Sequence, residues 1–283
     1  MEMLKVSGNT YIFPGPTTIG LYLNDNKATI IDTGIDENGI RKIFNYLNEK
    51  GISINSVINT HSHADHIGGN AYLEKKGVEN FYSSEIESFF IRNTEFLPQY
   101  IFGSKAPKFM QNKFLMAERT KNVKTMLPDI FKVIDLTGHS WQMIGILTED
   151  DILFCADAFY SENIVLKHPL LFHIDTENFL KKMDEILNMN YKKIISHGGI
   201  INDAERTINI NKNAIVNIIN KIIDSLPNYM DSIYSSLSMD LNFNSPWEFY
   251  LNMVPFKSIL TYLERNNKVK FSLREGKIYL DKI

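Results

Sequence analysis

The stretch "NTHSHADHIGG", residues 59–69, places three histidines and an aspartate within six positions of a chain that has only seven histidines: His61, His63, Asp65 and His66. A buried imidazole or carboxylate needs a partner or a shifted pKa, so a hydrophobic core does not favour this pattern. The density is also unusual for a surface loop. The stretch therefore predicts a metal site, provided that the rest of the chain supplies further ligands.

Composition sets the frame for this site. The chain has 283 residues, 44% of them hydrophobic and 22% charged, which fits one large globular domain with or without a small appendage. Its net charge of -3 gives no overall attraction to nucleic acid or to an anionic membrane. Cys155 is the only cysteine, so neither an intramolecular disulfide nor a cysteine zinc cluster forms. We see no export signal or membrane-length apolar run, and expect a cytoplasmic protein without a membrane partner.

The first third of the chain alternates predicted strands and helices. Short strands fit "NTYIF", "TTIGLYL" and "KATIIDTG", and a helix fits residues 37–50, where apolar residues recur at helical spacing before Gly51. "SVINT", residues 56–60, is a predicted buried strand that leads directly into the histidine cluster. A strand, a ligand loop and then a short helix form the α/β pattern in which sites lie beyond strand ends.

Residues 83–131 interrupt this alternation. Their aromatic residues and methionines follow no clean period and are broken by three prolines, so we expect a helical insertion that caps the site. Strands then resume, followed by a helix from Thr176, its expected N-cap, and a strand ending at His197. A long helix fits residues 203–226, and we place a domain boundary behind it, with residues 1–226 as the metal-binding domain.

The C-terminal stretch 227–283 predicts a helix, a strand, a turn at Glu275-Gly276 and a second strand. This is the outline of a small winged-helix-like domain.

Three further candidate ligands each follow a predicted strand: His139 in "LTGHS", Asp157 in "FCADAF" and His197 in "ISHGG". Imidazole and carboxylate suit zinc and, less selectively, iron or manganese. A catalytic zinc usually keeps three protein ligands, so seven candidates are too many for one metal. They suit two metals roughly 3.5–4 Å apart that share a bridge.

This order of motifs resembles the metallo-β-lactamase superfamily of hydrolases, whose early aspartate motif is matched by "IDTG", residues 31–34. The resemblance covers roughly residues 9–200 and extends to the glyoxalase II, lactonase and endoribonuclease-like branches. It implies an α/β fold, a four-layer αββα sandwich with the metals at one edge between the sheets. Two positions depart from the usual motifs: Thr137 stands where proline is usual, and Ala156 stands where glycine is usual.

The resemblance also implies roles for the seven ligands. His61, His63 and His139 would hold one metal, Asp65, His66 and His197 the other, and Asp157 would bridge them. Asp32 would steady the cluster loop by hydrogen bonding. We expect two zinc ions, with iron or manganese at one or both sites as the alternative.

The expected activity is hydrolysis of a small-molecule ester, thioester or lactone by a metal-bridging hydroxide. A thiolate leaving group needs no general acid, whereas an alkoxide would take a proton from Asp65 or Tyr160. His168 and His173 lie outside the motifs, and either a structural role or a place in the substrate pocket is open to them.

The second hypothesis is a metal-dependent endoribonuclease or phosphodiesterase. In the C-terminal stretch the basic residues outnumber the acidic ones, Glu264, Glu275 and Asp281; the basic residues are Lys257, Arg265, Lys268, Lys270, Arg274, Lys277 and Lys282. We favour a solvated face of a packing domain over a nucleic-acid surface. A non-hydrolytic protein is less expected, since no ligand is missing, and an exported β-lactamase is disfavoured. A homodimer is left open.

Overall fold

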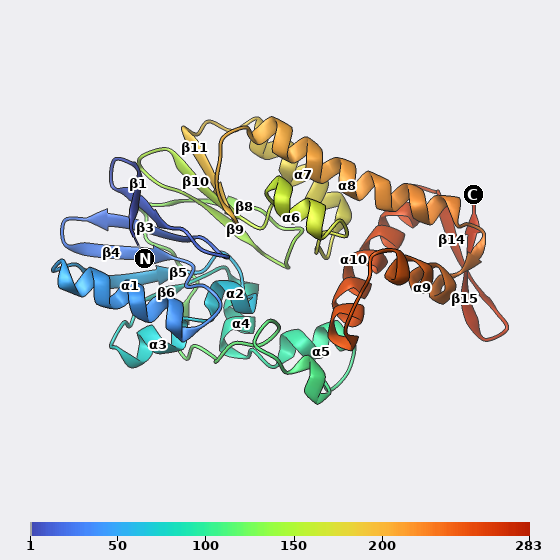
Figure 1. The fold of residues 1–283 in the computed structure, drawn as a ribbon, viewed down its shortest axis with the longest axis horizontal. Helices are drawn as coiled ribbons and strands as arrows, with labels where there is room; N and C mark the ends of the chain where they lie inside the picture. Colours follow the sequence, from blue (N-terminus) through green and yellow to red (C-terminus); the bar gives the residue numbers. More distant parts are fainter. Residues whose placement is uncertain (1) are drawn as a thin grey trace.

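The computed structural model describes residues 2–283 and contains two mixed sheets that pack face to face (Figure 1). The first sheet has its strands in sequential order: β1 (Leu4–Ser7), β2 (Thr10–Phe13), β3 (Ile19–Asn24), β4 (Lys27–Ile31), β5 (Ser53–Ile58), β6 (Phe81–Tyr82) and β7 (Val123–Lys124). The second has the order β12 (Gly199–Ile201), β11 (Lys193–Ser196), β10 (Ile152–Ala156), β9 (Ile144–Leu147) and β8 (Lys132–Asp135).

Two parallel strand pairs bring the candidate residues to one edge of the sandwich. In the first sheet β4 runs parallel to β5, with Ile31 opposite Ile58, so the segments that follow these residues leave the sheet together. In the second sheet β10 runs parallel to β11, with Ala156 opposite Ser196. Asp32 follows the end of β4, and the histidine cluster follows the end of β5. Asp157 follows β10, and His197 follows β11.

Helices cover the outer face of each sheet, which gives the expected αββα layers. The first sheet packs against α1 (Glu37–Glu49) and α3 (Asn70–Lys75), and the second against α6 (Glu162–Lys167), α7 (Thr176–Leu187) and α8 (Ala204–Asp224). Helix α1 buries Ile40, Ile43 and Leu47, whose spacing places them on one face. A separate cluster that includes Ile12 of β2 and Phe154 of β10 fills the space between the sheets. The predicted fold class is confirmed.

The expected N-cap of α7 is wrong by one residue. The carboxylate of Asp175 accepts the amide hydrogen of Asn178, so Asp175 is the cap and Thr176 the first helical residue. The hydroxyl of Thr176 instead forms hydrogen bonds with Ser258 and His173. Threonine is a common N-cap residue, but the side chain of Thr176 is used in tertiary contacts.

The segment 83–131 contains α4 (Glu85–Arg92), α5 (Phe96–Phe102) and the short 3-10 helix η1 (Lys108–Met110). It is not helical throughout, because its last part returns to the first sheet as edge strand β7, parallel to β6. Between these ends, Leu97, Ile101, Met110 and Leu115 form a small core of their own. This core also contacts residues near the C-terminus, so the segment connects two distant parts of the chain.

The C-terminal part has the element order of a winged helix: β13 (Asn228–Tyr229), α9 (Met230–Asp240), α10 (Pro246–Arg265), β14 (Val269–Arg274) and β15 (Lys277–Lys282). Its strands form an antiparallel sheet in the order β13-β15-β14, and both Glu275 and Gly276 have positive φ in the predicted turn. Ile218 and Ile222 of α8 lie in the same hydrophobic cluster as α9 and α10. Helix α8 therefore belongs to the sandwich at one end and to the C-terminal core at the other (Figure 1).

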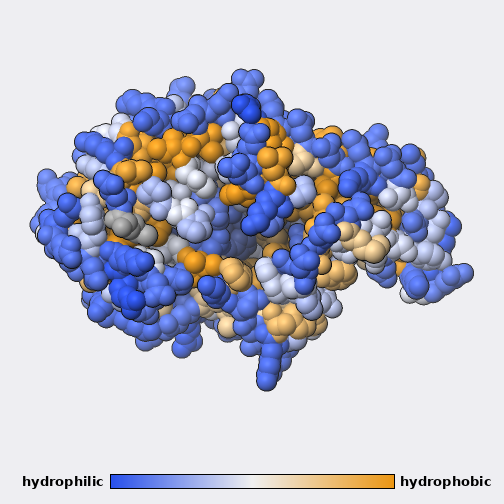
Figure 2. Space-filling model, in the orientation of Figure 1, coloured by the Kyte–Doolittle hydropathy of each residue, from blue (hydrophilic) through white to orange (hydrophobic). Residues whose placement is uncertain are grey.

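Hydrophilic residues cover most of the face drawn in Figure 2, with apolar residues gathered in patches between them. Within residues 2–283, no helix combines the length and the apolar character needed to cross a bilayer.

Candidate metal centre

The loop between β5 and α3 carries the first four candidate ligands. His63 caps the short helix α2 (Ala64–Ile67), whose single turn brings Asp65 and His66 to the same edge as His61. The loop then passes so close to the neighbouring chain that a Cβ on Gly68 would lie 2.1 Å from the carbonyl oxygen of Ile35. Only glycine fits there, which explains why the motif ends in glycine.

His61, His63 and His139 form the first group of candidate ligands, with ligand atoms that all lie within 4.8 Å of one another. Nδ1 of His63 lies 2.8 Å from Nε2 of His139. Nδ1 of His61 contacts the hydroxyl of Thr60, but its Nε2 is buried and has no hydrogen-bond partner among the described residues 2–283. A buried nitrogen without a partner costs free energy unless something binds there.

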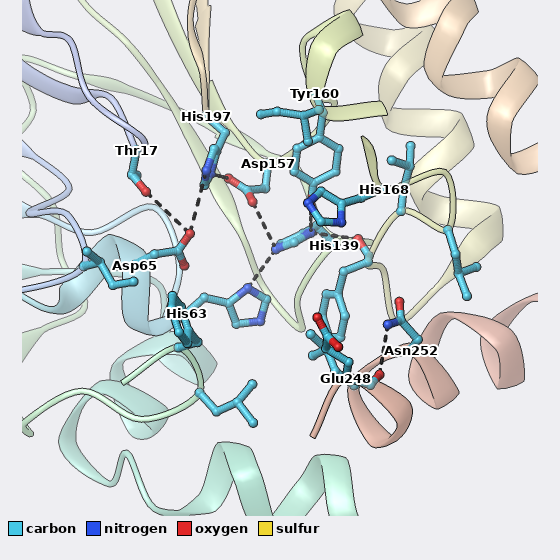
Figure 3. Close-up of a pocket in the computed structure, with 18 of the residues that line it drawn as sticks. Thr17, His63, Asp65, His139, Asp157, Tyr160, His168, His197, Glu248 and Asn252 are labelled. Carbon is cyan, nitrogen blue, oxygen red and sulfur yellow. Dashed lines mark hydrogen bonds and ion pairs between the residues drawn. The ribbon is translucent and has the colours of Figure 1, made fainter. Parts of the chain in front are cut away.

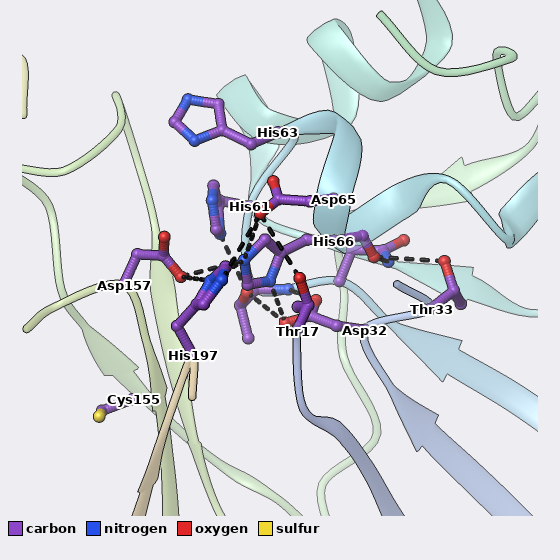
Figure 4. Close-up of polar contacts among 12 residues, drawn as sticks. Thr17, Asp32, Thr33, His61, His63, Asp65, His66, Cys155, Asp157 and His197 are labelled. Carbon is purple, nitrogen blue, oxygen red and sulfur yellow. Dashed lines mark hydrogen bonds and ion pairs between the residues drawn. The ribbon is translucent and has the colours of Figure 1, made fainter. Parts of the chain in front are cut away.

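Asp65, His66 and His197 form the second group. Nε2 of His66 lies 3.2 Å from Nδ1 of His197, and Oδ2 of Asp65 lies 4.0 Å from Nε2 of His66 and 3.8 Å from Nε2 of His197. Figure 4 shows Asp65 and His66, both on α2, facing His197, which follows β11. Asp65 is the most exposed of the three, with 30% of its side chain accessible.

Asp157 lies between the two groups and presents one oxygen to each. Its Oδ1 is 3.0 Å from Nε2 of His66 and 3.0 Å from Nδ1 of His197, whereas its Oδ2 is 3.7 Å from Nε2 of His139. This is the arrangement that a carboxylate needs to bridge two metals.

The donor set fits metal ions. Two ligand atoms that each lie about 2 Å from a tetrahedral zinc are about 3.3 Å apart, and the distances above bracket this value. The orphaned Nε2 of His61 and the bridging carboxylate would both gain a partner. The three groups of His and Asp side chains are therefore consistent with a dinuclear metal site that these seven residues could hold.

Electrostatics support a cation at the second group. Burial alone would lower the pKa of His66, but the carboxylates of Asp157, Asp32 and Asp65 outweigh burial and raise that pKa well above its usual value. The pKa of His197 is also raised against the effect of burial, chiefly by Asp157. Surplus negative charge thus surrounds this group, and a bound metal cation would neutralise it.

The first group differs in charge. Burial, followed by neighbouring histidines, lowers the pKa of His61 well below its usual value, and burial likewise lowers the pKa of His139. Both imidazoles are therefore neutral at physiological pH, which is the form that binds metal.

A sequence profile described as the metallo-beta-lactamase superfamily matches residues 12–198, more than half of the chain and including all seven ligands. The chain belongs to the metallo-beta-lactamase superfamily. Its metal centre is that of the metal-dependent hydrolases in this superfamily.

Relatives of known activity are distant. The chain is 27% identical over 145 residues to a hydroxyacylglutathione hydrolase from Prochlorococcus marinus (strain MIT 9312), covering 50% of each chain. It is 27% identical over 143 residues to hydroxyacylglutathione hydrolase 1 from Vibrio vulnificus (strain YJ016), covering 50% of this chain and 47% of that one. The chain thus spans about half the length of the curated relatives it matches.

Two solved structures share the fold across almost the whole chain. A beta-lactamase domain protein from Burkholderia ambifaria aligns with a TM-score of 0.72 at 15% identity, covering 100% of this chain and 94% of that one. A metallo-beta-lactamase family protein from Thermus thermophilus aligns with a TM-score of 0.71 at 16% identity, covering 97% and 99%. At such identities the similarity shows the fold, including its C-terminal part.

Asp32 lies behind the superfamily's histidine loop, where the sequence placed it. Its Oδ1 accepts the amide hydrogen of Thr60, and its Oδ2 accepts the Thr60 hydroxyl and lies 2.7 Å from Nδ1 of His66. The hydrogen bond to Nδ1 leaves Nε2 of His66 free to face the metal position. Asp32 thereby orients both the loop and one ligand.

Glu87 of α4 is a functional residue that the sequence reasoning missed. Its buried carboxylate accepts hydrogen bonds from the amide and hydroxyl of Ser62, between two ligands of the first group, and from the Ser140 hydroxyl and the Gln142 amide beside His139. Glu87 thereby joins two ligand loops. The only sequence signal is an acidic residue at helical spacing from Ile91 in "IESFFIR", which alone does not distinguish a buried carboxylate from an exposed one.

A cavity of about 430 Å³ opens over the metal centre (Figure 3). Tyr160 lines this cavity, and its hydroxyl lies 3.0 Å from Nδ1 of His139. Burial, followed by the charge of Asp157, raises the pKa of Tyr160 well above its usual value, so the phenol stays protonated. Of the two histidines outside the motifs, His168 lines the cavity, while His173 is buried and stacks on Phe179 at 5.0 Å.

Proposed function

We propose that this protein is a dinuclear metal-dependent hydrolase that cleaves a small-molecule ester, thioester or lactone, with thioesters as the first class to test. One observation carries the proposal: His63, Asp65, His139, Asp157 and His197 all face a mostly apolar cavity beside the metal positions. A reacting carbonyl held in this cavity would lie beside both metal positions. The names of the distant relatives, hydroxyacylglutathione hydrolases, support a thioester as the scissile group.

When bound, two metal ions would lower the pKa of water and polarise the substrate carbonyl. The chain contributes the rest. Asp65 is partly exposed toward the cavity and can accept a proton from the attacking water. The Tyr160 hydroxyl can donate a proton to an alkoxide leaving group, which a thiolate does not need. Apolar walls exclude bulk water from the reacting atoms.

We propose zinc for both positions because imidazole and carboxylate ligands suit it, with iron or manganese as the alternative at one or both. Cys155 is a buried free thiol that donates a hydrogen bond to the carbonyl of Ile195, which is compatible with the reducing cytoplasm that we propose as its compartment.

The endoribonuclease alternative depends on the basic C-terminal residues, and several of these have partners within the protein. Arg274 pairs with Asp281 and lies over the ring of Tyr279, and Arg265 lies 3.8 Å from Glu177. These contacts favour a packing role for the face. RNA binding that weakens with salt and is lost with Lys268→Glu and Lys270→Glu would favour the alternative instead.

Metal content tests the proposal directly. Protein purified without added metal is analysed by elemental analysis, together with Asp157→Ala and with the exposed-site control Asp151→Ala. We expect about two zinc ions per chain in the wild type and in the control, and one or fewer in Asp157→Ala. Chelation should abolish hydrolysis of thioester, lactone and aryl ester substrates, and added zinc should restore it. Equal metal content in Asp157→Ala and the wild type would rule out the bridge.

A further inference from the structure

The walls of the cavity come from three distant parts of the chain. The insertion, the loop after α6 and the first turns of α10 each supply apolar side chains: Ile101, Phe114 and Leu115; Leu170, Leu171 and Phe172; Trp247 and Leu251. Phe114 stacks on Trp247 with ring centroids 5.8 Å apart, and Leu251 packs against the core of the insertion. The insertion and the C-terminal helix thus meet over the metal centre and enclose an apolar space.

Outside the candidate ligands, the charge that the lining of this space carries is the carboxylate of Glu248. Apart from the candidate ligands, the polar residues lining it are Thr17, Tyr160, His168, Glu248 and Asn252. Among residues 2–283, neither a lysine nor an arginine lines the cavity. Figure 3 shows Glu248 and Asn252 on the side of the cavity opposite Asp65 and His197. A substrate bound to the metals would therefore extend toward a carboxylate.

The helix cap holds Glu248 in this place. Ser245 is the N-cap of α10 and accepts the amide hydrogen of Glu248, while the Glu248 carboxylate accepts the Ser245 hydroxyl at 3.0 Å and the Asn244 amide hydrogen at 2.9 Å. This reciprocal arrangement resembles a capping box. Because both hydrogen bonds hold Oε2 at the tip of the side chain, the negative charge stays at the cavity wall.

We infer that the cavity selects uncharged substrates: a thioester or ester with an apolar acyl group, whose leaving group carries no carboxylate. This inference rests on the proposed function. A leaving group such as glutathione has two carboxylates, which here would lose water without gaining a lysine or arginine partner and would approach Glu248. Glu248 is thus a specificity-determining residue in addition to its part in the helix cap. The expected substrates differ from the hydroxyacylglutathiones for which the distant relatives are named.

Two substrates with the same scissile bond test this inference in the zinc-loaded protein. S-hexanoyl-N-acetylcysteamine is neutral in its leaving group, and S-hexanoylglutathione is anionic. Hydrolysis breaks the C–S bond of each, adding hydroxyl from water to the acyl carbon and hydrogen to sulfur. We expect kcat/KM to be at least about tenfold higher for the neutral thioester. An equal or higher value for S-hexanoylglutathione would overturn the inference while supporting the proposed function.

Glu248→Gln separates selectivity from capping, because glutamine can also serve in a capping box. The variant should reduce the preference for the neutral thioester about threefold or more, with unchanged thermal stability. Glu264→Gln, an exposed position near the other end of α10, is the matched control and should keep the wild-type preference. An unchanged preference in Glu248→Gln would leave the glutamate as a cap only and overturn its assigned role.

Binding gives a readout that does not depend on turnover. The thioethers S-hexyl-N-acetylcysteamine and S-hexylglutathione cannot be hydrolysed, and isothermal titration calorimetry compares their affinities. We expect the neutral thioether to bind at least about tenfold more tightly. If neither thioester is hydrolysed but this difference is present, the proposed thioesterase activity fails and the charge selectivity of the cavity stands. Equal affinities would overturn the selectivity.

Discussion

Oε2 of Glu87 lies 2.6 Å from Oγ of Ser62, at the centre of the loop that carries the first metal ligands. The other carboxylate oxygen lies 2.6 Å from Oγ of Ser140, beside His139. The carboxylate of Glu87 therefore holds together two loops that come from different sheets: the loop after β5 and the loop between β8 and β9. We therefore expect metal affinity in this site to depend on Glu87, which is not itself one of the candidate ligands.

Glu87→Gln replaces one accepting oxygen with an amide that donates, so buried donors of one serine loop lose their partner. We expect the free energy of unfolding to fall by about 1–3 kcal/mol. Zinc content under limiting metal should fall as well, because the ligand loops are no longer held together. Chemical denaturation and elemental analysis check both. Glu85→Gln, an exposed position on the same helix, should retain both properties, and a Glu87→Gln protein with wild-type zinc affinity would contradict the positioning role.

Tyr160→Phe removes the hydroxyl that lies beside His139 and faces the cavity. If the phenol donates a proton to the leaving group, kcat should fall roughly 100-fold for an alkyl ester. For a thioester the expected loss is only a few-fold, because a thiolate leaves without a general acid. Steady-state kinetics on an ester and a thioester with the same acyl group measure the difference. A similar loss on both would assign Tyr160 to holding His139 instead.

The buried position of His173 leads us to expect that the folded protein loses stability in acid. Burial lowers its pKa to about 4 in the folded protein, below the value near 6.5 of an unfolded chain. The folded state therefore favours neutral His173, and this contribution is complete above about pH 6.5 and is lost as the pH falls toward 4. The linkage amounts to about 3 kcal/mol. Urea denaturation of the wild type and His173→Gln at pH 7 and pH 4.5 should show a smaller loss in the variant; parallel pH profiles would refute the assignment.

Ala156 has a φ of +46°, in the left-handed region that costs a residue with a Cβ about 1–2 kcal/mol. This is the position where the superfamily motif usually has glycine. Ala156→Gly removes the strain but also a buried methyl group, so we expect a change in unfolding free energy close to zero. Ala214→Gly, in the middle of α8, should lose about 1 kcal/mol or more. Thermal denaturation compares the two, and an equally large loss at both sites would show that Ala156 is unstrained.

Most of the metal ligands could be predicted because their segments follow strand ends, and parallel pairing of β4 with β5 and of β10 with β11 brings those strand ends to one edge. His139 lies instead in the connection between the antiparallel strands β8 and β9. The role of Asp32 followed from the resemblance of "IDTG" to the superfamily's early aspartate motif. Glu87 could not be predicted, since its importance comes from contacts with Ser62 and Ser140 that are distant in sequence.

The place of α10 in the fold could not be predicted from the sequence for a similar reason. Its helical pattern gives the helix, but not the neighbour against which it packs. Trp247 lines the cavity and stacks there on Phe114 of the insertion, more than a hundred residues earlier in the sequence. Thr176 shows the same limit locally: a threonine at a helix start resembles a cap until Ser258 is seen to occupy its hydroxyl.

Helix α10 supplies part of the cavity wall, whereas all candidate metal ligands lie before residue 198. Residues for bond breaking and for substrate selection would therefore be encoded in different regions of the gene. Mutations in α10 can change the cavity wall without altering any candidate metal ligand; the lining residues there are Trp247, Glu248, Leu251 and Asn252. Substrate specificity could therefore evolve while the metal-binding residues stay the same. A chain that ended behind α8 would keep all seven ligand residues in its sequence but would lack the side chains that α10 adds to the cavity wall.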